Sequence, residues 1–513
     1  MKYRIIYIAC LLFTITFSSE AQKEAYNWCF GDSIGLTWNT TQTMSLTDVS
    51  GSVTKELKGL PTHMEIAPVI TTREGCFSLS DENGQLSLYS DGSSIWNRNH
   101  KVMPNGSGLK GHLSSPQSGI AFPYPGHPNQ YVCVTVGIEV YNNLAYSIVD
   151  MTRRGGLGEV ISTQKNLLFP NYEGLAGEAL SAVGNATGDG YWIVALTRGI
   201  DGSNDRLYAW LLTKDGLSDT PVVSILPGKD TLLKETGYLK FSPNGKYFVL
   251  CGGDKNKLLY AGKFNTSTGL CSDVKELVSA LGLSNSINGF YGVEFSKNSE
   301  LVYIAHPGSW KSNFHILCFN IKDMLASSKP QTVPYKKFNT LKFSPASVQM
   351  GPDGRIYISG IDMNQGKYEK HRLFVLDNPN DYENFNIFEL PTDFIPTYKT
   401  PTNIGLPSFI PNWFLFLTGP SHFCVNTSQT FTLNVTDNEN ILSYTKWDFG
   451  DGSTVETGSN SLPQSKPHVY SSPGTYTITV KLFDSNDVEI DTQTLEVSVS
   501  PCSMPVNPNI HLY

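Results

Sequence analysis

The sequence predicts an all-β protein, and composition, alternation and turn residues lead to that fold class. Charged residues make up only 16% of the 513 residues, whereas Gly (45), Pro (29), Tyr (25) and Phe (26) are numerous, so short strands and tight turns are favoured over surface helices. Apolar residues alternate with polar ones, as at Tyr476, Ile478 and Val480. Turn-forming pairs such as Asn83-Gly84 separate these runs.

The charge of the chain argues against one class of partner. The formal net charge is -8, and no run of basic residues interrupts the sequence. Nucleic acids and anionic membrane surfaces are bound by basic patches, so we expect no nucleic-acid partner. With 40% hydrophobic residues the chain can form packed cores, and its length indicates more than one domain.

Residues 1–21 are a predicted signal peptide. Lys2 and Arg4 precede an apolar run from Ile5 to Phe17, which is followed by Ser19-Glu20-Ala21, with small residues at the cleavage positions. The run is too short to cross a bilayer, and we expect no transmembrane segment elsewhere. The sequence therefore predicts an exported protein of the periplasm, the outer-membrane surface or the cell exterior.

Residues 22–420 contain a repeated unit of a strand, a tight turn and a second apolar strand. Clear copies are Phe77–Ser80 before Leu86–Tyr89, Tyr238–Phe241 before Tyr247–Leu250, and Val348–Met350 before Ile356–Ile358. The turns recur roughly every 45 to 60 residues, and two further strands follow in each unit, as in the blade of a β-propeller. We predict a seven-bladed β-propeller, with six blades as the alternative.

Strands at the two ends of this region are left without a complete unit. They lie near Trp28 and Trp38 at the start and after Gly405 at the end. A sheet ring without free edges leaves no unpaired backbone groups. We therefore expect the first strands to pair with the last in one closing blade.

Residues 421–501 carry a second, different pattern. Its motif residues are Trp447, Asp448, Phe449, Gly450, Asp451, Gly452, His468, Tyr470, Pro473, Gly474 and Tyr476. They closely resemble the PKD domain, which implies an Ig-like β-sandwich followed by a short tail at 502–513. Asp448 and Asp451 suggest calcium as an alternative, but carboxylates in Asp-Gly turns more often accept bonds from nearby backbone amides, so we expect no metal.

Longer matches extend this resemblance over nearly the whole mature chain. They are Asn27-Trp28 to Gly35-Leu36, Glu74–Asp81, Tyr89–Gly92, Ile95–His100, Met103–Gly106, Ser114–Ser118, Tyr146–Met151, Gly155–Gly158 and Gly405–Phe409. Together with the PKD motif they resemble the secreted WD40-like propeller-plus-PKD proteins of Bacteroidota, associated with gliding motility and type IX secretion. The resemblance implies a fold and a cell-envelope setting but no reaction. Longer members continue into a sorting domain, so the short tail here leads us to expect periplasmic residence or surface attachment through a partner.

The cysteines allow one specific pairing to be predicted. Cys10 lies in the signal peptide, where lipidation is an alternative, and export permits disulfides among the rest. Cys424 and Cys502 bracket the PKD segment, so we expect them to be linked. Cys133 and Cys318 lie in apolar strand runs, as does Cys251, which indicates buried free thiols.

The motifs of common hydrolases and nucleotide-binding enzymes are missing from the sequence. It contains no Gly-rich phosphate loop, no His-Glu-x-x-His, no Cys-x-x-Cys and no nucleophile elbow at a strand-to-helix junction. We therefore expect no cofactor and no catalytic residues, and interpret the chain as a binding or scaffold protein for an envelope protein or glycan. A polysaccharide hydrolase or lyase with its site over the propeller channel is the alternative.

The predicted recognition surface lies on the loops that join the second and third strands of each unit. Its candidate binding residues are Trp96, Arg98, His100, Arg198, Asp254, His306, Trp310 and Tyr368. Exposed aromatic side chains mixed with charges on supported loops suit recognition. For Trp96 and His100 the alternative is an internal plug that holds their loop. The oligomeric state is left open.

Overall fold

The computed structural model describes most of the chain. The described residues are 23–138, 143–171, 174–199, 206–227, 237–252, 258–277, 289–306, 315–326, 333–339, 343–364, 367–391, 394, 405–415, 417–434 and 442–501. Within them the protein is all-β, apart from the short helix α1 (Ile321–Ala326) and 3-10 turns at Arg153–Gly155, Ser162–Gln164 and Pro411–Phe414. The predicted fold class is confirmed at that level.

Seven antiparallel sheets succeed one another along the described part of the chain from residue 27 to residue 389. The first three contain β1 (Asn27–Phe30), β2 (Ile34–Thr47) and β3 (Thr54–His63); β4 (Phe77–Ser80), β5 (Leu86–Ser90), β6 (Ser94–Asn97) and β7 (Val102–Ser107); and β8 (Gly119–Pro123), β9 (Gln130–Val136), β10 (Leu144–Asp150), β11 (Glu159–Val160) and β12 (Leu167–Leu168). The fourth and fifth contain β13 (Gly174–Gly184), β14 (Tyr191–Gly199), β15 (Arg206–Thr213), β16 (Gly216–Leu217) and β17 (Val222–Ile225); and β18 (Gly237–Phe241), β19 (Tyr247–Gly252), β20 (Leu258–Phe264) and β21 (Cys271–Glu276). The sixth and seventh contain β22 (Val293–Phe295), β23 (Leu301–His306), β24 (His315–Asn320) and β25 (Tyr335–Asn339); and β26 (Phe343–Met350), β27 (Ile356–Asn364), β28 (Lys367–Asp377) and β29 (Asn386–Glu389).

The turns between the first two strands of each sheet follow from local sequence. Gly84 and Gly245 have φ values of 82° and 71°, which a residue with a Cβ rarely adopts. In the fifth sheet the Asn244 Oδ1 accepts hydrogen bonds from the Ser242 hydroxyl at 2.7 Å and from the Lys246 amide at 3.0 Å. Such short-range bonds explain why these turns could be recognised in the sequence.

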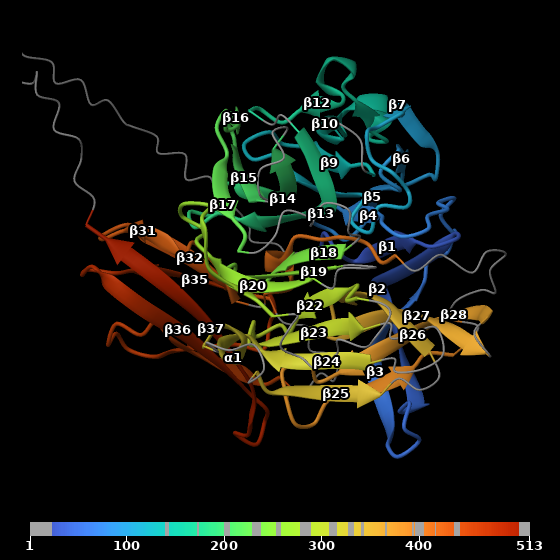
Figure 1. Ribbon diagram of the computed structural model, residues 1–513. Helices are drawn as coiled ribbons and strands as arrows, with labels where there is room; N and C mark the ends of the chain where they lie inside the picture. The colour runs from blue at the N-terminus through green and yellow to red at the C-terminus, as the bar shows by residue number, and fades with distance from the viewer. Residues whose placement is uncertain are drawn as a thin grey trace, which may run out of the picture.

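The first strands of successive sheets pack against one another in chain order, from β1 through β4, β8, β13, β18 and β22 to β26 (Figure 1). The seventh sheet then contacts the first. Asp48 bridges Phe388, and the Val49 amide donates to the Ile387 carbonyl at 2.9 Å. Arg355 adds a hydrogen bond between these two sheets, because its guanidinium donates to the Lys58 carbonyl of β3 at 2.9 Å. The same guanidinium also donates to the Asp377 carboxylate of β28 at 2.9 Å.

The predicted pairing of the N-terminal strands with the segment after Gly405 is wrong. β1 pairs with β2, and β2 with β3. The later segment instead forms an isolated parallel bridge between Pro407 and Cys76, where the Ser408 amide donates to the Cys76 carbonyl at 3.0 Å. The physical reason is that Pro407 has no N–H to give to a sheet ladder, so this segment packs by its side chains.

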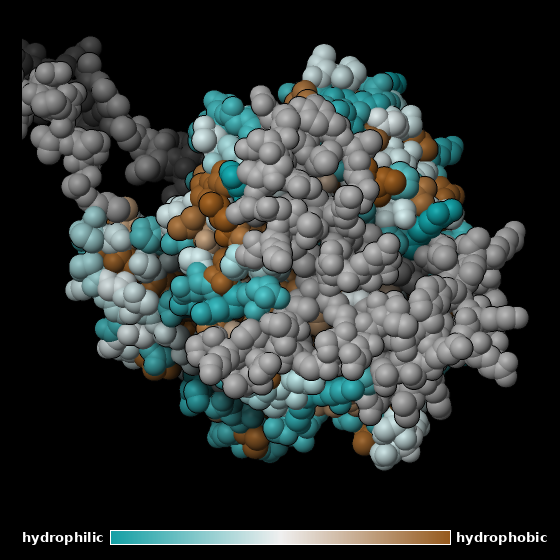
Figure 2. All heavy atoms as spheres, in the orientation of Figure 1, coloured by the Kyte–Doolittle hydropathy of each residue, from teal (hydrophilic) through white to brown (hydrophobic). Residues whose placement is uncertain are grey.

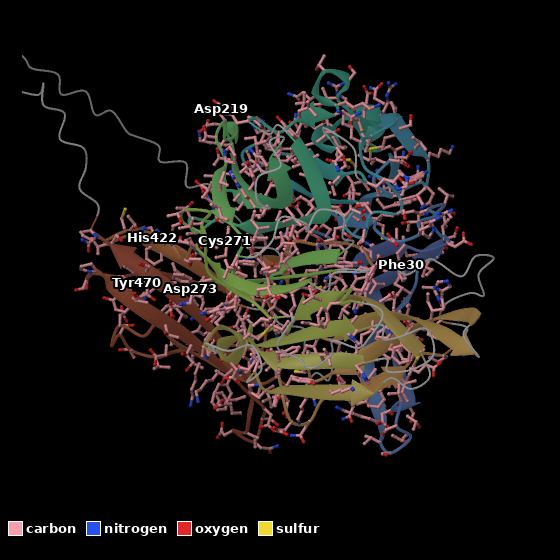
Figure 3. The ribbon with its side chains drawn as sticks, in the orientation of Figure 1. Phe30, Asp219, Cys271, Asp273, His422 and Tyr470 are labelled. Carbon is pink, nitrogen blue, oxygen red and sulfur yellow. The ribbon has the colours of Figure 1, made fainter. Side chains whose placement is uncertain are left out.

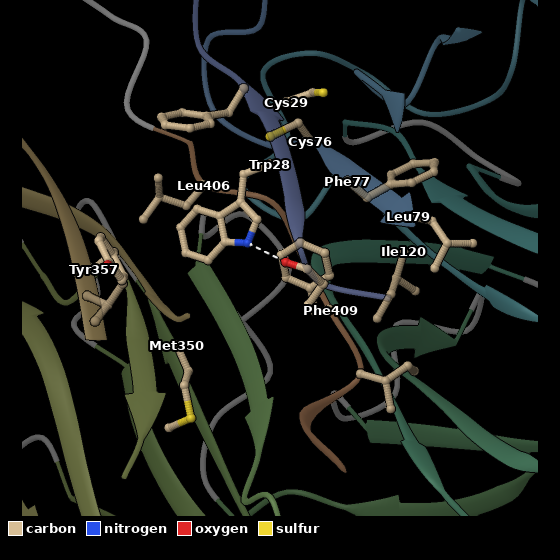
Figure 4. Close-up of a cluster of buried hydrophobic side chains, with 14 of the residues drawn as sticks. Trp28, Cys29, Cys76, Phe77, Leu79, Ile120, Met350, Tyr357, Leu406 and Phe409 are labelled. Atoms are coloured by element: carbon tan, nitrogen blue, oxygen red, sulfur yellow. Dashed lines mark hydrogen bonds between the residues drawn. The ribbon is translucent and has the colours of Figure 1, made fainter. Parts of the chain in front are cut away.

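Residues 405–414, here called the strap, are held in the hydrophobic core by aromatic contacts. Phe409 packs on Trp28, with 5.9 Å between ring centroids. Trp28 is fully buried and also contacts Trp38 at 4.9 Å and Tyr357 at 5.5 Å, so it joins the first sheet, the seventh sheet and the strap (Figure 4). Its indole N–H donates to the Ala25 carbonyl at 3.0 Å.

The C-terminal domain is a sandwich of two sheets, at the left of Figure 1. One sheet has the order β30 (Leu417–Thr418), β32 (Ser428–Leu433), β35 (Gln464–Val469); the other has β31 (His422–Cys424), β37 (Glu489–Ser500), β36 (Gly474–Phe483), β33 (Tyr444–Asp448), β34 (Glu456–Gly458). The side chains of His422 and Tyr470 lie in this domain, and Cys271 and Asp273 lie on β21 of the fifth sheet (Figure 3).

Apolar side chains are also exposed on one outer strand of the fourth sheet. Val223 and Ile225 of β17 are 38% and 62% exposed, and hydrophobic atoms gather in this part of the surface (Figure 2). A substitution at one of these exposed positions can therefore serve as a control for a substitution in the core.

Replacing Phe409 with Ala should destabilise the seven-sheet domain by about 3–5 kcal/mol, because it opens a cavity beside Trp28. Urea unfolding followed by tryptophan fluorescence measures the change. The exposed Ile225→Ala variant is the control and should shift the unfolding midpoint little. Equal midpoints for both variants would contradict a core role for the strap.

Candidate functional site

Polar side chains from three inner strands meet at the centre of the seven-sheet domain. Lys240 of β18 forms an ion pair with Glu294 of β22 at 3.0 Å and donates to the Gln349 Oε1 of β26 at 2.5 Å. The Lys240 and Glu294 side chains are each 4% exposed. The Glu294 carboxylate also accepts the backbone amides of Met350 and Phe295, each at 3.0 Å. The charges are thus paired and their hydrogen bonds largely satisfied, as burial requires.

Gln117 makes a second central link between sheets. Its Oε1 accepts the Leu180 amide at 3.1 Å and the Leu239 amide at 2.8 Å, and its Nε2 donates to the Leu239 carbonyl at 3.0 Å. Gln117 is 1% exposed. One amide side chain therefore substitutes for ladder bonds between β13 and β18.

The strap crosses this centre and leads to the PKD-like sandwich. Near its start, a Cβ on Gly405 would stand 1.1 Å from the Glu74 carbonyl oxygen, so only glycine fits. At its other end, the Asn412 Oδ1 accepts the Gly184 amide at 2.7 Å and its Nδ2 donates to the Pro243 carbonyl at 2.8 Å. The strap thereby ties the inner strands of several sheets to the chain that enters β30.

Glu74 is a largely buried carboxyl group beside the start of the strap. Burial raises its pKa from 4.5 to about 7, while Ser114 and Tyr291 oppose the rise. It precedes β4 and lies beside the first residue of the strap. A carboxyl group with a pKa near 7 is suited to proton transfer at neutral pH, so it is the relevant group for the enzymatic alternative.

The predicted recognition residues divide between the two ends of the sheets. In an antiparallel sheet, successive turns alternate between the two ends, so loops between second and third strands lie opposite the turns between first and second strands. The predicted placement of Trp96, Arg98 and His100 on such a loop is wrong: Trp96 lies on β6, the third strand of its sheet, and Arg98 and His100 lie in the turn from β6 to β7, at the same end as the turns between first and second strands. The reason is that β5 already ends at Ser90, so the chain turns before Trp96. Trp96 is half-buried and stacks on Tyr89 at 5.5 Å with an interplanar angle of 11°. The His100 Nδ1 lies 3.1 Å from the Tyr89 hydroxyl, and burial lowers the His100 pKa. Arg98 is exposed and donates to the Gly156 carbonyl at 2.5 Å.

Of the other five candidate binding residues, the structure describes the side chain of His306. His306 is 1% exposed and stacks on His315 at 5.8 Å. Arg198 and Tyr368 belong to β14 and β28, but their side chains are outside the described part of the structure, and Asp254 and Trp310 lie outside the described residues. The loop surface as a recognition site stays a prediction.

Sequence reasoning missed the central residues, although the signal was present. Lys240 stands inside the apolar run Tyr238–Phe241, and Glu294 stands between Val293 and Phe295. A lone charge in the middle of an otherwise apolar strand indicates a buried partner, because an unpaired buried charge is costly.

The junction between the two domains contains a cavity of about 430 Å³. Its walls come from the turns between the first two strands of the fifth and sixth sheets and from β36 and β37. The domains are held together there by an ion pair between Lys246 and Glu496 at 2.6 Å and by bonds from the Ser421 and His422 amides to the Ala186 carbonyl, each 3.1 Å. This junction lies at the end of the sheets opposite the loops between second and third strands.

Several of the PKD motif residues make contacts within the C-terminal domain. The Asp448 Oδ1 accepts the Gly450 amide at 2.8 Å, and the Asp451 Oδ1 accepts the Ser453 amide at 3.0 Å, as the turn interpretation predicts. The second Asp451 oxygen lies 2.8 Å from the His468 Nε2. Trp447 is fully buried, and the Phe449 ring stacks on His468 at 3.9 Å.

The cysteines follow the prediction in part. Cys133, Cys251 and Cys318 are buried free thiols, which confirms their assignment. Cys424 is disulfide-bonded, whereas Cys502 lies outside the described residues, so the pairing of these two stays a prediction.

Two kinds of feature are absent from the described residues. Among them, no group of three or more His, Cys, Asp or Glu side chains is placed to hold a metal ion. Of the helices in this part of the chain, none combines the length and the apolar character of a membrane span.

Comparison with known proteins identifies the C-terminal domain. Residues 416–499 match the PKD domain family. Human polycystin-1-like protein 1 is 36% identical over 94 residues, which cover 18% of this chain and 3% of that protein. The chain therefore spans a very small part of this curated relative.

Solved structures give weaker likenesses. A PKD domain of an M14-like peptidase from Thermoplasmatales archaeon SCGC AB-540-F20 is 26% identical and covers 17% of this chain and 91% of its own, with a TM-score of 0.15. The β-propeller domain of the Trilobed protease from Pyrococcus furiosus is 10% identical and covers 76% and 98%, with a TM-score of 0.30. The extracellular domain of BT4673 from B. thetaiotaomicron is 12% identical and covers 93% and 57%, with a TM-score of 0.34. At these scores the likenesses carry no argument about function.

Replacing Lys240 with Met should destabilise the protein by about 3–5 kcal/mol, because it leaves the Glu294 carboxylate buried without a cation. The double variant Lys240→Met, Glu294→Gln removes both charges and should recover much of the loss. Urea unfolding of the wild type and both variants measures this. A single variant as stable as the wild type would contradict the ion pair's role.

Glu74 should make stability depend on pH. Because its folded pKa of about 7 lies above the usual 4.5, the folded state holds the proton more tightly. Its contribution to stability is complete below about pH 4.5 and is lost as pH rises through 7, at up to about 1.4 kcal/mol per pH unit. Thermal unfolding between pH 4 and 8 should show a shallower fall in Glu74→Gln than in the wild type. Glu24, whose pKa burial also raises to about 7, adds to the slope, so Glu24→Gln is the parallel variant. An unchanged slope in Glu74→Gln would contradict the assignment.

Proposed function

We propose that the protein is an exported binding or scaffold protein of the cell envelope, in which a closed seven-bladed β-propeller at 22–420 supports the recognition loops and a PKD domain at 421–501 acts as a spacer or second contact. The observation that carries this proposal is the filled centre of the seven-sheet domain. The Lys240–Glu294 pair and the strap occupy the place where the inner strands converge. A centre packed in this way gives a rigid support for loops.

The position of the C-terminal domain supports the same proposal. It is docked through Ala186 and Lys246 on the turns between first and second strands, so the opposite loop-bearing end is left for a partner. The match of residues 416–499 to the PKD family agrees with export, and the signal peptide at 1–21 is its proposed route. Membership of the Bacteroidota gliding-motility group rests on the sequence resemblance.

A polysaccharide hydrolase or lyase is the second candidate, and Glu74 favours it. Its raised pKa fits a general acid, and it lies at the loop-bearing end, before β4 begins. Glu294, by contrast, is held by Lys240 and by two backbone amides, which suits a structural carboxylate.

Replacing Trp310 with Ala should weaken binding to an envelope partner by about 2 kcal/mol while leaving the melting temperature nearly unchanged. The partner is first isolated from an envelope extract with wild-type protein and then titrated against purified variants. Trp96→Ala is the comparison: because Trp96 stacks on Tyr89, it should lower the melting temperature. Undiminished binding by Trp310→Ala would place the functional surface elsewhere. Polysaccharide turnover that Glu74→Gln abolishes would favour the enzyme instead.

A further inference from the structure

The cavity between the two domains has the size and the lining of a ligand site. Its volume of about 430 Å³ lies within the range of small-molecule pockets, which often form at domain interfaces. Asn244, Asn298 and Asn380 line it from the seven-sheet domain, and Thr477 and Thr494 line it from the PKD domain. The loops between second and third strands are at the other end of the sheets and make no use of it.

The asparagines are held in place by their oxygens. The Asn298 Oδ1 accepts the Ser296 hydroxyl at 2.6 Å and the Glu300 amide at 3.2 Å, the same arrangement that Asn244 makes in the preceding sheet. The Asn380 Oδ1 accepts the Asn298 amide at 3.0 Å, which links neighbouring turns. Within the described part of the chain, the Nδ2 groups of these three residues donate no hydrogen bond. The cavity wall therefore carries three oriented amide donors.

The opposite wall is a hydroxyl-bearing face of the PKD sheet. Thr492, Thr494 and Glu496 alternate along β37 and are exposed, so they share one face. In the register with β36, Thr494 lies beside Thr479 and Glu496 beside Thr477. Because a hydroxyl both donates and accepts hydrogen bonds, this face can bond either the donor or the acceptor groups of a hydroxylated ligand.

Two of the three lysines in the lining are paired with its two glutamates. Lys246 binds Glu496 at 2.6 Å, and Lys322 binds Glu300 at 2.9 Å, while the third, Lys297, is only 8% exposed. A pocket in which most of the cations are already paired favours a neutral ligand over an anion. Tyr247, also in the lining, adds an aromatic side chain on which an apolar sugar face can pack.

We propose that this interdomain cavity binds a neutral oligosaccharide, with the asparagine amides and threonine hydroxyls bonding its hydroxyl groups. The inference rests on the proposed binding role of the protein but concerns a different surface from the loops. It gives the PKD domain a direct part in recognition, because neither domain forms both walls.

The first test variant keeps the turn intact and removes one hydrogen-bond donor from the cavity wall. Asn298→Asp retains an oxygen at the Oδ1 position for Ser296 and Glu300 but has no Nδ2. The seventh sheet already carries an aspartate in the corresponding turn, where the Asp353 Oδ1 accepts the Arg355 amide at 3.3 Å. The turn therefore tolerates a carboxylate, and the variant should fold.

A second pair of variants tests the PKD wall. Thr494→Trp places a bulky ring in the cavity, whereas Thr457→Trp makes the same change at an exposed position of β34 that is not in the lining. Binding of the full chain to neutral hexasaccharides of glucose, mannose, xylose and N-acetylglucosamine, with hexagalacturonate as an acidic comparator, is measured by titration calorimetry.

We expect at least one neutral hexasaccharide to bind, Asn298→Asp to weaken it about tenfold, Thr494→Trp to abolish it, and Thr457→Trp to leave it unchanged. Binding that survives both cavity variants, a preference for hexagalacturonate, or no binding of any neutral probe would overturn the inference. Because envelope-partner binding is measured separately with Trp310→Ala, the failure of one proposal is distinguishable from failure of the other.

Discussion

The convergence of inner strands at the centre of the seven-sheet domain is the constraint on which the remaining structure depends. Strands that meet there carry polar side chains out of water, and each of these must find a partner. Lys240 meets this requirement by binding Glu294 and Gln349, which stand on two other sheets. Gln117 meets it by bonding the backbones of β13 and β18. The polar groups that are costly to bury therefore also set the relative positions of the sheets.

The strap extends this arrangement to the second domain. Phe409 packs on Trp28, Asn412 bonds the Gly184 amide and the Pro243 carbonyl, and the chain then enters β30 of the sandwich. The linker between the domains is thus part of the first core rather than a free tether. Together with the Lys246–Glu496 pair, it holds the PKD domain against one end of the sheets. Linkers with few contacts allow domain motion, and this one has many.

The docking gives the molecule two distinct ends. In the second sheet, Arg98 is exposed while Trp96 and His100 pack around Tyr89, so these predicted contact residues also support their own turn. At the end that carries the turns between first and second strands, the two domains form a polar cavity in which Lys246 and Lys322 are paired with glutamates. The interdomain cavity and the loops between second and third strands are therefore separate surfaces.

The sequence by itself determined the features that depend on contacts between residues close together in the chain. The turns at Asn83-Gly84 and Ser242–Gly245, the all-β class and the Asp448 and Asp451 turns follow from bonds over a few positions, so local pattern was sufficient. Trp96 and His100 were recognised as either contacts or plugs for the same reason. Only the tertiary structure decided that Pro407 meets Cys76 rather than the N-terminal strands, that Lys240 meets Glu294, and that the PKD domain closes a cavity over Asn298. These contacts join residues far apart in the chain, and the partner of each is set by how whole sheets pack, which no local pattern specifies.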